Sequence, residues 1–380
     1  MFSSQPLTSR ALELGFNLVG ITSALPSPRL EAYQRWIAAG MHGDMAYMAR
    51  PDRQRRRADL DAILLGARSL IVVGMDYHAL NVPAAVLSDP TRGRIAAYAW
   101  GRDYHETMTP RLEALADWLR VESQESIATR VYVDTGAILE RSHAQQAGLG
   151  FIGKNTMLIG ARRGSYFFLG ELLTDLAFDV YDTPHRETMC GLCQRCQPAC
   201  PTSAFPAPYT LDSRRCISYL TIEHQGAIPR DLRPLMGNWV YGCDVCQDVC
   251  PFNRFALPSP LLEVTRERAA PPLRDLLAMD AADFRDRFAG SPIARLKRDR
   301  LVRNACVAAG NSGDRDLVPL LETLLSDPAP LVRSHAAWAI GRLGSHETGT
   351  IADLLCHHRT RETDPDVQQE IDLILGEDVC

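Results

Sequence analysis

The stretch CGLCQRCQPACP, residues 190–201, holds four cysteines separated by two, two and three residues, with a proline directly after the last. Bacterial ferredoxins with two iron–sulfur clusters use this run, and in them the fourth cysteine ligates the other cluster. A second half follows at Cys216 and in CDVCQDVCP, residues 243–251. It departs from the simple pattern because residues 217–242 separate Cys216 from Cys243, so this segment is expected to loop out.

The crossing rule assigns the eight cysteines to two cubane clusters. The first takes Cys190, Cys193, Cys196 and Cys250, and the second takes Cys200, Cys216, Cys243 and Cys246. A pair of zinc sites is the alternative, since paired Cys-x-x-Cys motifs also suit tetrahedral zinc. Zinc does not account for the third cysteine two residues further on, nor for the Cys-Pro that ends both halves. The pattern therefore favours two 4Fe-4S clusters that carry electrons to a site where chemistry takes place.

The overall composition is that of an ordinary globular protein with room for more than one domain. The chain has 380 residues, of which 46% are hydrophobic and 23% charged, so a disordered or fibrous chain is excluded. The net charge of -5 excludes a protein that coats nucleic acid by bulk charge, although local basic patches are allowed. The sequence shows no secretion signal and no membrane-spanning run, which predicts a cytoplasmic protein. In that reducing compartment, clustered cysteines hold metal rather than disulfides.

Three segments differ in pattern, which predicts a multidomain chain. Residues 1–183 mix helical spacing with short β-rich runs and are expected to form an α/β or α+β domain. Residues 184–258 are expected to form a ferredoxin-type domain that its metal stabilises. Residues 259–380 are expected to form HEAT-like helical repeats, because LVRNACVAA at 301–309 returns as LVRSHAAWA at 331–339. A plain helical bundle is the alternative, since the repeat is short.

Two motifs in the first segment bear on where the chemistry takes place. Gly148, Gly150 and Gly153 spell G-x-G-x-x-G, but a helix-like run precedes them and a β-like run follows, the reverse of a dinucleotide site. They therefore predict a helix C-cap that leads into a strand. Asp134 follows the strand-like run RVYV, read as a central strand whose end would face a ligand. It is the candidate proton donor, with a simple turn residue as the alternative.

Six separated motifs together resemble the epoxyqueuosine reductase family. They are GRDYH (101–105), VDTGAILER (133–141), GLGFIGKN (148–155), GSYFFLGELL (164–173), the two cysteine halves, and RRCISYLTIEHQGAIP (214–229). The resemblance spans roughly residues 10–343 in the family's order, and the last 37 residues carry no such motif. It implies an oxidoreductase that converts epoxyqueuosine to queuosine at the wobble position of tRNA, the last step of queuosine biosynthesis.

The same resemblance implies a cofactor and contacts that spacing alone does not show. Cobalamin is expected to bind base-off between the N-terminal domain and the cluster domain, with Asp134 as the proton donor. His105 lies in DYHETM, which is similar to a cobalt-binding D-x-H-x-x-G element, but Met108 replaces the glycine, so His105 is not expected to ligate cobalt. Cofactor contacts are expected at Arg57, Asp134, Arg141, Lys154, Ser165 and Ser218, and substrate contacts at Tyr104 and His105.

The expected partners are a tRNA with a modified wobble guanosine and an electron donor such as ferredoxin or flavodoxin, with the protein itself a monomer. A basic run in the repeat segment suits an RNA backbone, and its expected tRNA contacts are Arg298, Arg300 and Arg303. Two alternatives stay open: an electron-transfer module without its own substrate, and a reductive dehalogenase-like enzyme acting on a small molecule. A small substrate would not need the basic run.

Overall fold

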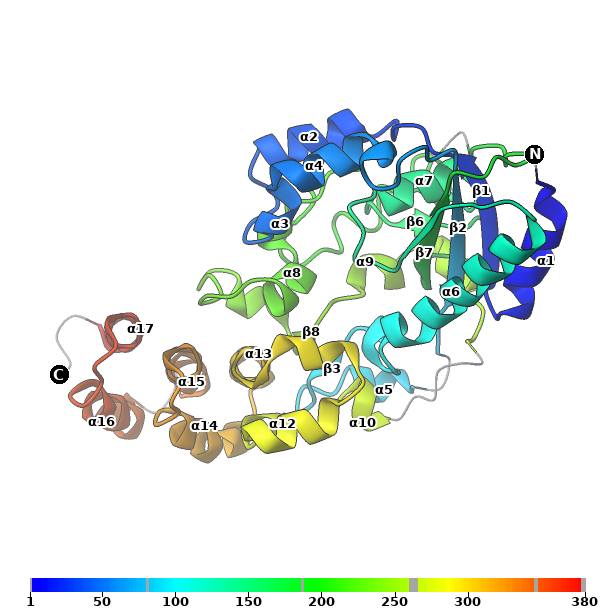
Figure 1. Ribbon diagram of the computed structural model, residues 1–380. Helices are drawn as coiled ribbons and strands as arrows, with labels where there is room; N and C mark the ends of the chain where they lie inside the picture. The colour runs from blue at the N-terminus through cyan, green and yellow to red at the C-terminus, as the bar shows by residue number, and fades with distance from the viewer. Residues whose placement is uncertain (1, 80–81, 186–187, 260–265, 345–347, 377–380) are drawn as a thin grey trace. The chain divides into compact units, whose positions relative to one another are not determined.

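The computed structural model describes residues 2–79, 82–185, 188–259, 266–344 and 348–376, and Figure 1 shows the elements along the chain. The chain divides into two compact units, each built from segments that are distant in sequence. The first comprises Met1–Leu80, Arg102–Arg214 and Asp244–Leu262, and the second comprises Asn81–Gly101, Arg215–Cys243 and Glu263–Cys380. The segment proposed as a cluster domain, residues 184–258, is thus shared between the two units.

An antiparallel four-stranded sheet forms the centre of the first unit, with strand order β1-β2-β7-β4. Its strands are β1 (Leu18–Ser23), β2 (Ser69–Asp76), β7 (Phe167–Thr174) and β4 (Thr129–Tyr132). β2 is buried along its whole length, which explains the continuous apolar run in its sequence. The prediction that Asp134 follows a central strand is wrong, because β4 lies at the edge of the sheet, beside β7.

Helices pack on both faces of this sheet (Figure 1). α6 (Tyr104–Glu122) and α1 (Ser4–Glu13) lie on one face. Gly170 of β7 lets α6 approach closely, since a Cβ there would lie 2.8 Å from Leu112 Cδ1. α7 (Glu140–Gln146) lies on the other face, where Ala144 packs in one core with Val72 and Leu173.

The rest of the first unit consists of short elements around the sheet. They are α2 (Leu30–Ala38), α3 (Ala46–Ala49), α4 (Pro51–Ala58), η1 (Leu60–Ala62), β5 (Phe151–Ile152), β6 (Leu158–Ile159), α9 (Val245–Asp248) and η5 (Pro251–Phe255). Gly148 and Gly150 lie between α7 and β5, Gly153 directly follows β5, and Gly148 adopts a left-handed φ of 75° just after the helix ends. The prediction of a helix C-cap that leads into a strand is therefore confirmed.

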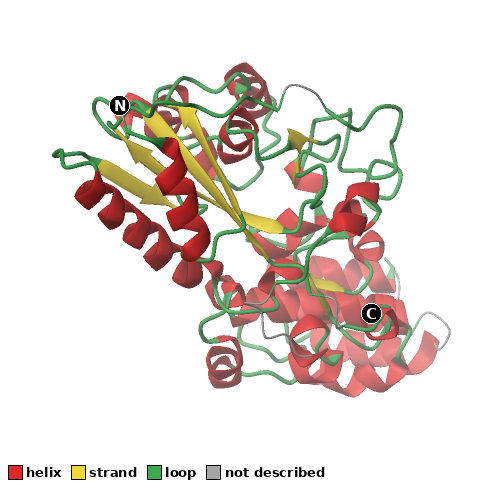
Figure 2. Ribbon diagram, turned by 90° about the vertical axis from the view of Figure 1, so that its right-hand side faces the viewer, coloured by secondary structure: helices red, strands yellow, loops and turns green. Residues whose placement is uncertain are grey.

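The second unit is mainly helical, with one short parallel strand pair, β3 (Arg94–Ile95) and β8 (Trp239–Tyr241). Figure 2, coloured by secondary structure, shows the mainly helical C-terminal part of the chain. Its helices are α5 (Ala84–Leu87), η2 (Ala97–Ala99), α8 (Ile217–Ile222), η4 (Arg233–Met236), α10 (Arg266–Ala269), α11 (Leu273–Leu277), α12 (Ala281–Phe288), η6 (Pro292–Leu296), α13 (Arg298–Ser312), η7 (Arg315–Leu317), α14 (Val318–Leu324), α15 (Pro330–Leu343), α16 (Thr348–Arg359) and α17 (Pro365–Leu375).

The predicted repeat corresponds to α13 and α15, which pack against each other, while α15 also packs on α17. The buried alanines of α13 and the contact of Gly310 with Trp338 allow this close approach. The segment between Cys216 and Cys243 does not simply loop out. It forms α8, η4 and β8, all of which pack on α13, and this is why it belongs to the second unit.

No helix in the described part of the chain is both long enough and apolar enough to cross a membrane.

Candidate functional site

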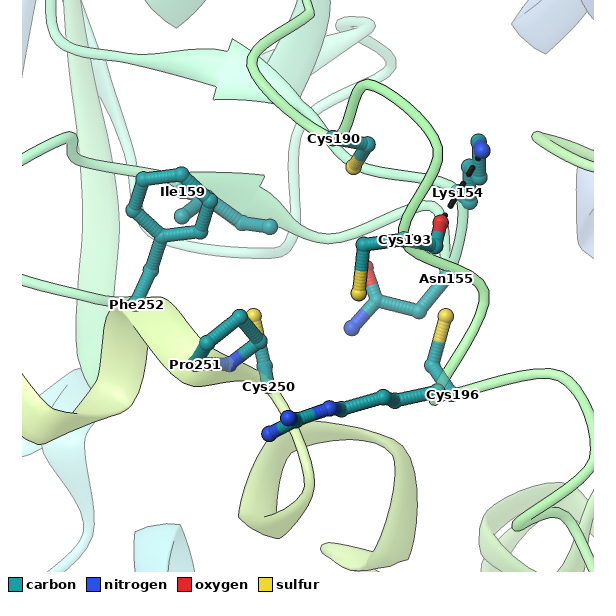
Figure 3. A pocket seen from close by; sticks show the side chains of 10 residues that line it. Lys154, Asn155, Ile159, Cys190, Cys193, Cys196, Cys250, Pro251 and Phe252 are labelled. Atoms are coloured by element: carbon teal, nitrogen blue, oxygen red, sulfur yellow. Dashed lines mark hydrogen bonds between the residues drawn. The ribbon is translucent and has the colours of Figure 1, made fainter.

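Four of the eight clustered cysteines line one cavity in the first unit (Figure 3). Cys190, Cys193 and Cys196 come from one loop, and Cys250 comes from the turn between α9 and η5. Figure 3 shows their sulfur atoms around a common space. Burial, and then the neighbouring thiols, raise the pKa of Cys196 and of Cys250. Four thiols around one space are the ligand set that a 4Fe-4S cluster requires.

Lys154 lies in the turn after β5 and holds the loop that carries three of these cysteines. Its ammonium donates hydrogen bonds to the carbonyls of Gly191, at 2.8 Å, and Cys193, at 2.9 Å. The side-chain amide of Asn155 donates to the carbonyl of Cys246 at 3.1 Å. The Lys154 ammonium is therefore used to order the cysteine loop, and it adds a positive charge beside the thiols.

The other four cysteines are divided between the two units. Cys200 and Cys246 lie in the first unit, whereas Cys216 and Cys243 lie in the second. Cys216 is the N-cap residue of α8, and Cys243 follows β8. Their assignment to a second cluster rests on the sequence spacing.

The turn after β4 carries the predicted proton donor. Asp134 is exposed and adopts a φ of 57°, in the left-handed region that aspartate tolerates better than most residues. Tyr104, the first residue of α6, donates its hydroxyl to Asp134 Oδ2 at 2.7 Å. The Tyr104 ring stacks on Phe168 of β7, with centroids 4.4 Å apart. The sheet therefore fixes the phenol that holds the carboxyl group.

His105 completes this polar group. Its ring stacks on Tyr104 with centroids 4.2 Å apart, and its Nδ1 lies 2.7 Å from Asp103 Oδ1. Asp103 is also the N-cap of α6, because it accepts a hydrogen bond from the His105 amide. The structure thus brings Tyr104, His105 and Asp134 together.

Two glutamates that the sequence reasoning did not single out lie behind the Asp134 turn. Glu140 begins α7 and accepts a hydrogen bond from the Asp134 amide, and its Oε1 has no partner among the described residues. Glu171 of β7 lies opposite Tyr132 of β4 and is fully buried. Neither of its carboxyl oxygens has a hydrogen-bond partner in the described part of the chain. The signal for Glu171 was a lone charged residue within the apolar run FFLGELL.

Burial and like charge alter the protonation of both glutamates. Burial, followed by the charge of Asp134, raises the pKa of Glu140 to about 8, against the opposing effect of Arg141 and Arg57. Burial, followed by the charge of Glu140, raises the pKa of Glu171 well above its ordinary value. Desolvation disfavours an ionised carboxyl group, so the pair holds protons at neutral pH.

Basic side chains of α4 and α7 lie near the same turn. Arg53 donates to the carbonyl of Thr135 at 3.0 Å, which ties α4 to the Asp134 turn. Arg57 is only 5% exposed, and its Nε has no hydrogen-bond partner in the residues described. Arg141 donates to the carbonyl of Thr156 at 2.6 Å. A buried guanidinium nitrogen without a partner and an exposed acid fit the amide-rich edge of a corrin, so these residues suit cobalamin.

Ser165 and Ser218, also predicted as cofactor contacts, have other surroundings. The buried hydroxyl of Ser165 donates to Gln247 Oε1 at 2.9 Å, and its amide donates to Asn253 Oδ1 at 2.6 Å. Ser165 therefore orders the segment around Cys250. Ser218 lies in α8, in the second unit, and is half-buried.

The basic run of the repeat segment is used within the second unit. Arg298 pairs with Asp327 at 2.5 Å, and Arg300 donates to the carbonyl of Ile222 at 2.8 Å. Arg303 is fully buried and donates to carbonyls of Leu220, His224 and Gly226, so the prediction that it contacts tRNA is wrong. The sequence shows that these residues are basic, but it does not show that the packing of α13 turns Arg303 inward.

Three family models match the chain. One is described as a 4Fe-4S double cluster binding domain (residues 189–253), one as epoxyqueuosine reductase QueG, DUF1730 (57–135), and one as HEAT repeats (293–374). An α+β unit with an acid site, a double-cluster segment and helical repeats together define an iron–sulfur oxidoreductase. The chain is 42% identical over 347 residues to the epoxyqueuosine reductase of Pseudomonas aeruginosa, covering 90% of this chain and 94% of that protein. The chain belongs to the epoxyqueuosine reductase family, which is cobalamin-dependent.

Other relatives and solved structures agree. The Escherichia coli epoxyqueuosine reductase is 41% identical over 343 residues, which cover 89% of each chain. A crystal structure of epoxyqueuosine reductase with an epoxyqueuosine-modified tRNA-Tyr stem loop is 33% identical, with a TM-score of 0.88 and coverage of 98% of this chain and 97% of that one. In a structure of the Bacillus subtilis enzyme, with the same coverage, 32% identity and a TM-score of 0.87, the catalytic aspartate loop is swung out of the active site.

Proposed function

We infer that the protein reduces epoxyqueuosine to queuosine at the wobble position of tRNA. The observation that carries this inference is the acid site of a family member: an exposed aspartate in a left-handed turn, held by the Tyr104 hydroxyl at 2.7 Å. Removal of an epoxide oxygen as water consumes two electrons and two protons. The chain therefore has to supply a positioned acid and a path for electrons, and it presents candidates for both.

Asp134 donates a proton to the oxygen that leaves the epoxide, and Tyr104 is a positioning residue that holds its carboxyl group. Cobalamin, when bound, would supply the reducing chemistry for this step, and the eight clustered cysteines would hold the clusters that deliver the electrons. A positioned acid contributes typically 10²–10⁴-fold to such a step. Arg57 and Arg141 are the side chains we assign to the edge of the cofactor.

We do not expect His105 to ligate the cobalt of a bound cobalamin, because its ring is already engaged by its neighbours. The Nδ1 of His105 lies 2.7 Å from Asp103 Oδ1, and its ring is held against Tyr104. Electron paramagnetic resonance of the protein loaded with cobalamin tests this assignment. The spectrum should be base-off in the parent and unchanged in His105→Ala, whereas nitrogen splitting that vanishes in this variant would contradict it.

The first cluster is held by Cys190, Cys193, Cys196 and Cys250, and the second by Cys200, Cys216, Cys243 and Cys246. Anaerobically prepared protein should carry about eight irons per chain. Cys250→Ala should damage the first cluster, although Cys250 belongs to the second motif, because its thiol shares a cavity with the first three cysteines. Cys306→Ala, a buried free thiol in α13, is the control and should keep both clusters. Loss of only the second cluster in Cys250→Ala would reject the assignment.

Electrons enter from a low-potential carrier such as ferredoxin or flavodoxin, which docks on the loop of the first cluster. Leu192, between two of the cysteines, is 99% exposed, and Met189 is 49% exposed. Exposed apolar side chains beside a redox centre favour brief contact with a protein donor. Leu192→Asp should slow reduction by a protein donor and leave reduction by dithionite unchanged. If the variant and the parent are reduced by the protein donor at the same rate, this surface is excluded.

Because its proposed substrate is a tRNA, we propose that the protein acts in the cytoplasm and as a monomer. The RNA contacts we now favour are the exposed Arg55 and Arg56 of α4 and the exposed Lys297 at the start of α13. These side chains are open to solvent, whereas Arg303 is not.

The direct test of this function is an anaerobic assay of the holoenzyme with an epoxyqueuosine-bearing tRNA stem loop and a low-potential reductant. Mass spectrometry of the digested RNA should show loss of one oxygen from the modified nucleoside, dependent on cobalamin. An active preparation that reduces small halogenated compounds but leaves the RNA unchanged would support the dehalogenase-like alternative instead.

A further inference from the structure

Two glutamates of the first unit have buried carboxyl oxygens without a hydrogen-bond partner among the described residues, although native proteins pair nearly all buried polar groups. Asp76, in the neighbouring strand β2, shows the ordinary solution: it is 5% exposed and forms an ion pair with Arg163. Glu171, at 0% exposure, has no partner for either oxygen among the described residues, and Glu140 has none for its buried Oε1. An uncompensated buried carboxylate is costly, so these side chains are stable there mainly as neutral acids.

The two glutamates lie on the protein side of the Asp134 turn. Glu171 is paired in register with Tyr132, two residues before Asp134, and its strand packs against α7, which Glu140 begins. Glu140 contacts the turn itself, because its carboxyl group accepts a hydrogen bond from the Asp134 backbone amide. The sheet and α7 thus place both carboxyl groups near enough to Asp134 for its charge to act on each of them.

Charged groups of α4, α7 and the Asp134 turn act on the pair. Asp134, Arg141 and Arg57 act on Glu140, whereas Glu171 is influenced by Glu140 and Asp134. His143, on the same helix, is buried, and burial lowers its pKa to about 4, so it is neutral at physiological pH. The two arginines reach only one member of the pair, and Glu171 keeps its proton.

We propose that Glu140 and Glu171 form a proton store that recharges Asp134 from the protein side after it has protonated the substrate. This inference rests on the proposed function. The Asp134 proton passes to the epoxide oxygen, a carboxyl proton of the pair then passes to the Asp134 carboxylate, and solvent refills the pair. The oxygen leaves as hydroxide with the proton from Asp134 and takes its second proton from solvent after release, and the two electrons come from the low-potential reductant by way of the clusters. Both glutamates are proton-relay residues and touch no substrate atom.

A substrate seated on Asp134 covers its exposed side, and exclusion of water at that moment favours the acid step. Reprotonation from solvent then has to wait for product release. A carboxyl pair behind the turn removes that delay. The store therefore affects repeated turnover, and it leaves the first proton transfer of a fully protonated enzyme intact.

The test compares first and later turnovers of the holoenzyme on an epoxyqueuosine stem loop with saturating reductant. Glu171→Gln and Glu140→Gln keep side-chain size and an acceptor oxygen, but they cannot release a proton at neutral pH. Each should keep the first-turnover rate within about twofold and slow later turnovers by about tenfold or more, in line with the lower range for positioned proton transfer. Glu113→Gln, an exposed glutamate of α6 in the same unit, is the matched control and should match the parent in both phases.

Infrared spectroscopy of the substrate-free enzyme gives a second readout that does not depend on the proposed substrate. The parent at pH 7 should show the carbonyl stretch of a protonated carboxylic acid, shifted in heavy water and reduced in Glu171→Gln. An equal loss of first and later turnovers would show that the glutamates only position Asp134. An unchanged rate of later turnovers in the Gln variants, or the absence of a protonated carboxyl band in the parent, would contradict the proposed proton store. If the parent shows the band but does not reduce epoxyqueuosine, the proposed substrate is wrong, whereas the protonated state of the buried pair is supported.

Discussion

Each of the two units contains a buried charged side chain, and the hydrogen bonding of these two side chains differs. Arg303, in the second unit, is fully buried and places all its donor nitrogens against oxygens of Leu220, His224, Gly226 and Asn304, at 2.8 to 3.0 Å. Glu171, in the first unit, is equally buried, and neither oxygen has a partner in the part of the chain that the structure describes.

This difference separates a structural residue from a functional one. A buried group that is fully hydrogen-bonded stabilises the elements it connects, and here Arg303 joins α13 to the carbonyls around α8. A buried group left without partners costs stability, and such costs persist mainly where chemistry needs them. The contrast predicts that removing Arg303 harms folding, whereas neutralising Glu171 harms only proton supply.

The largest effect is expected for Arg303→Met. The change keeps an apolar stem but leaves several buried carbonyl oxygens without donors, so the free energy of unfolding should fall by about 3–5 kcal/mol. Urea denaturation measures it, with Arg300→Met as the control, since replacing the half-buried Arg300 should cost about 1 kcal/mol. A stable Arg303→Met protein with weakened tRNA binding would show that Arg303 reaches RNA after all.

A pH-dependent effect, smaller over any one pH unit than the loss in Arg303→Met, is expected for the carboxyl pair. The pKa of Glu140 is raised in the folded state to about 8, so the native protein keeps protons that the unfolded chain loses from about pH 4.5 upward. The free energy of unfolding should therefore fall between about pH 4.5 and 8, by up to about 1.4 kcal/mol per pH unit for each retained proton.

Glu140→Gln and Glu171→Gln should each flatten this decline, and Glu113→Gln should not. Thermal or urea unfolding at several pH values measures the slope. If the stability of the parent is constant over this range, the pair is ionised in the folded protein. The pair could then not act as a proton store.

The smallest effect is expected at the surface. Arg55→Ala combined with Arg56→Ala should weaken stem-loop binding and lower its salt dependence, by up to about 0.7–0.9 units of slope for each phosphate that the two arginines neutralise. Arg120→Ala, an exposed arginine at the far end of α6, should leave the slope unchanged. An unchanged slope in the double variant would move the RNA surface to other exposed basic residues, of which Lys297 is the first to test.

Local patterns in the sequence were sufficient to predict part of the structure. The spacing of the cysteines predicted that Cys250 belongs with the first three, and these four thiols do line one cavity. The helical repeat was visible because the run Leu-Val-Arg at 301–303 and Ala309 recur thirty residues later, and α13 and α15 do pack together. In both cases the residues that decide the structure lie in short segments with a fixed spacing.

Other features depended on contacts that no local pattern records. The edge position of β4 follows from the strand order, in which β7 arrives from a later part of the chain. The burial of Arg303 follows from the carbonyls of residues 220–226, which are distant in sequence. Glu140 and Glu171 become a pair only when α7 packs on β7, so neither residue was selected from the sequence.

The central claim is that Asp134 protonates the oxygen that leaves epoxyqueuosine, and the turnover rate of Asp134→Asn tests it most directly. The variant keeps the size of the side chain and removes the transferable proton. With both clusters, cobalamin and stem-loop affinity retained, its rate should fall by about 10²–10⁴-fold, or roughly 3–5 kcal/mol of barrier. Turnover near the parent rate in a variant that still holds cobalamin would show that another group supplies the proton.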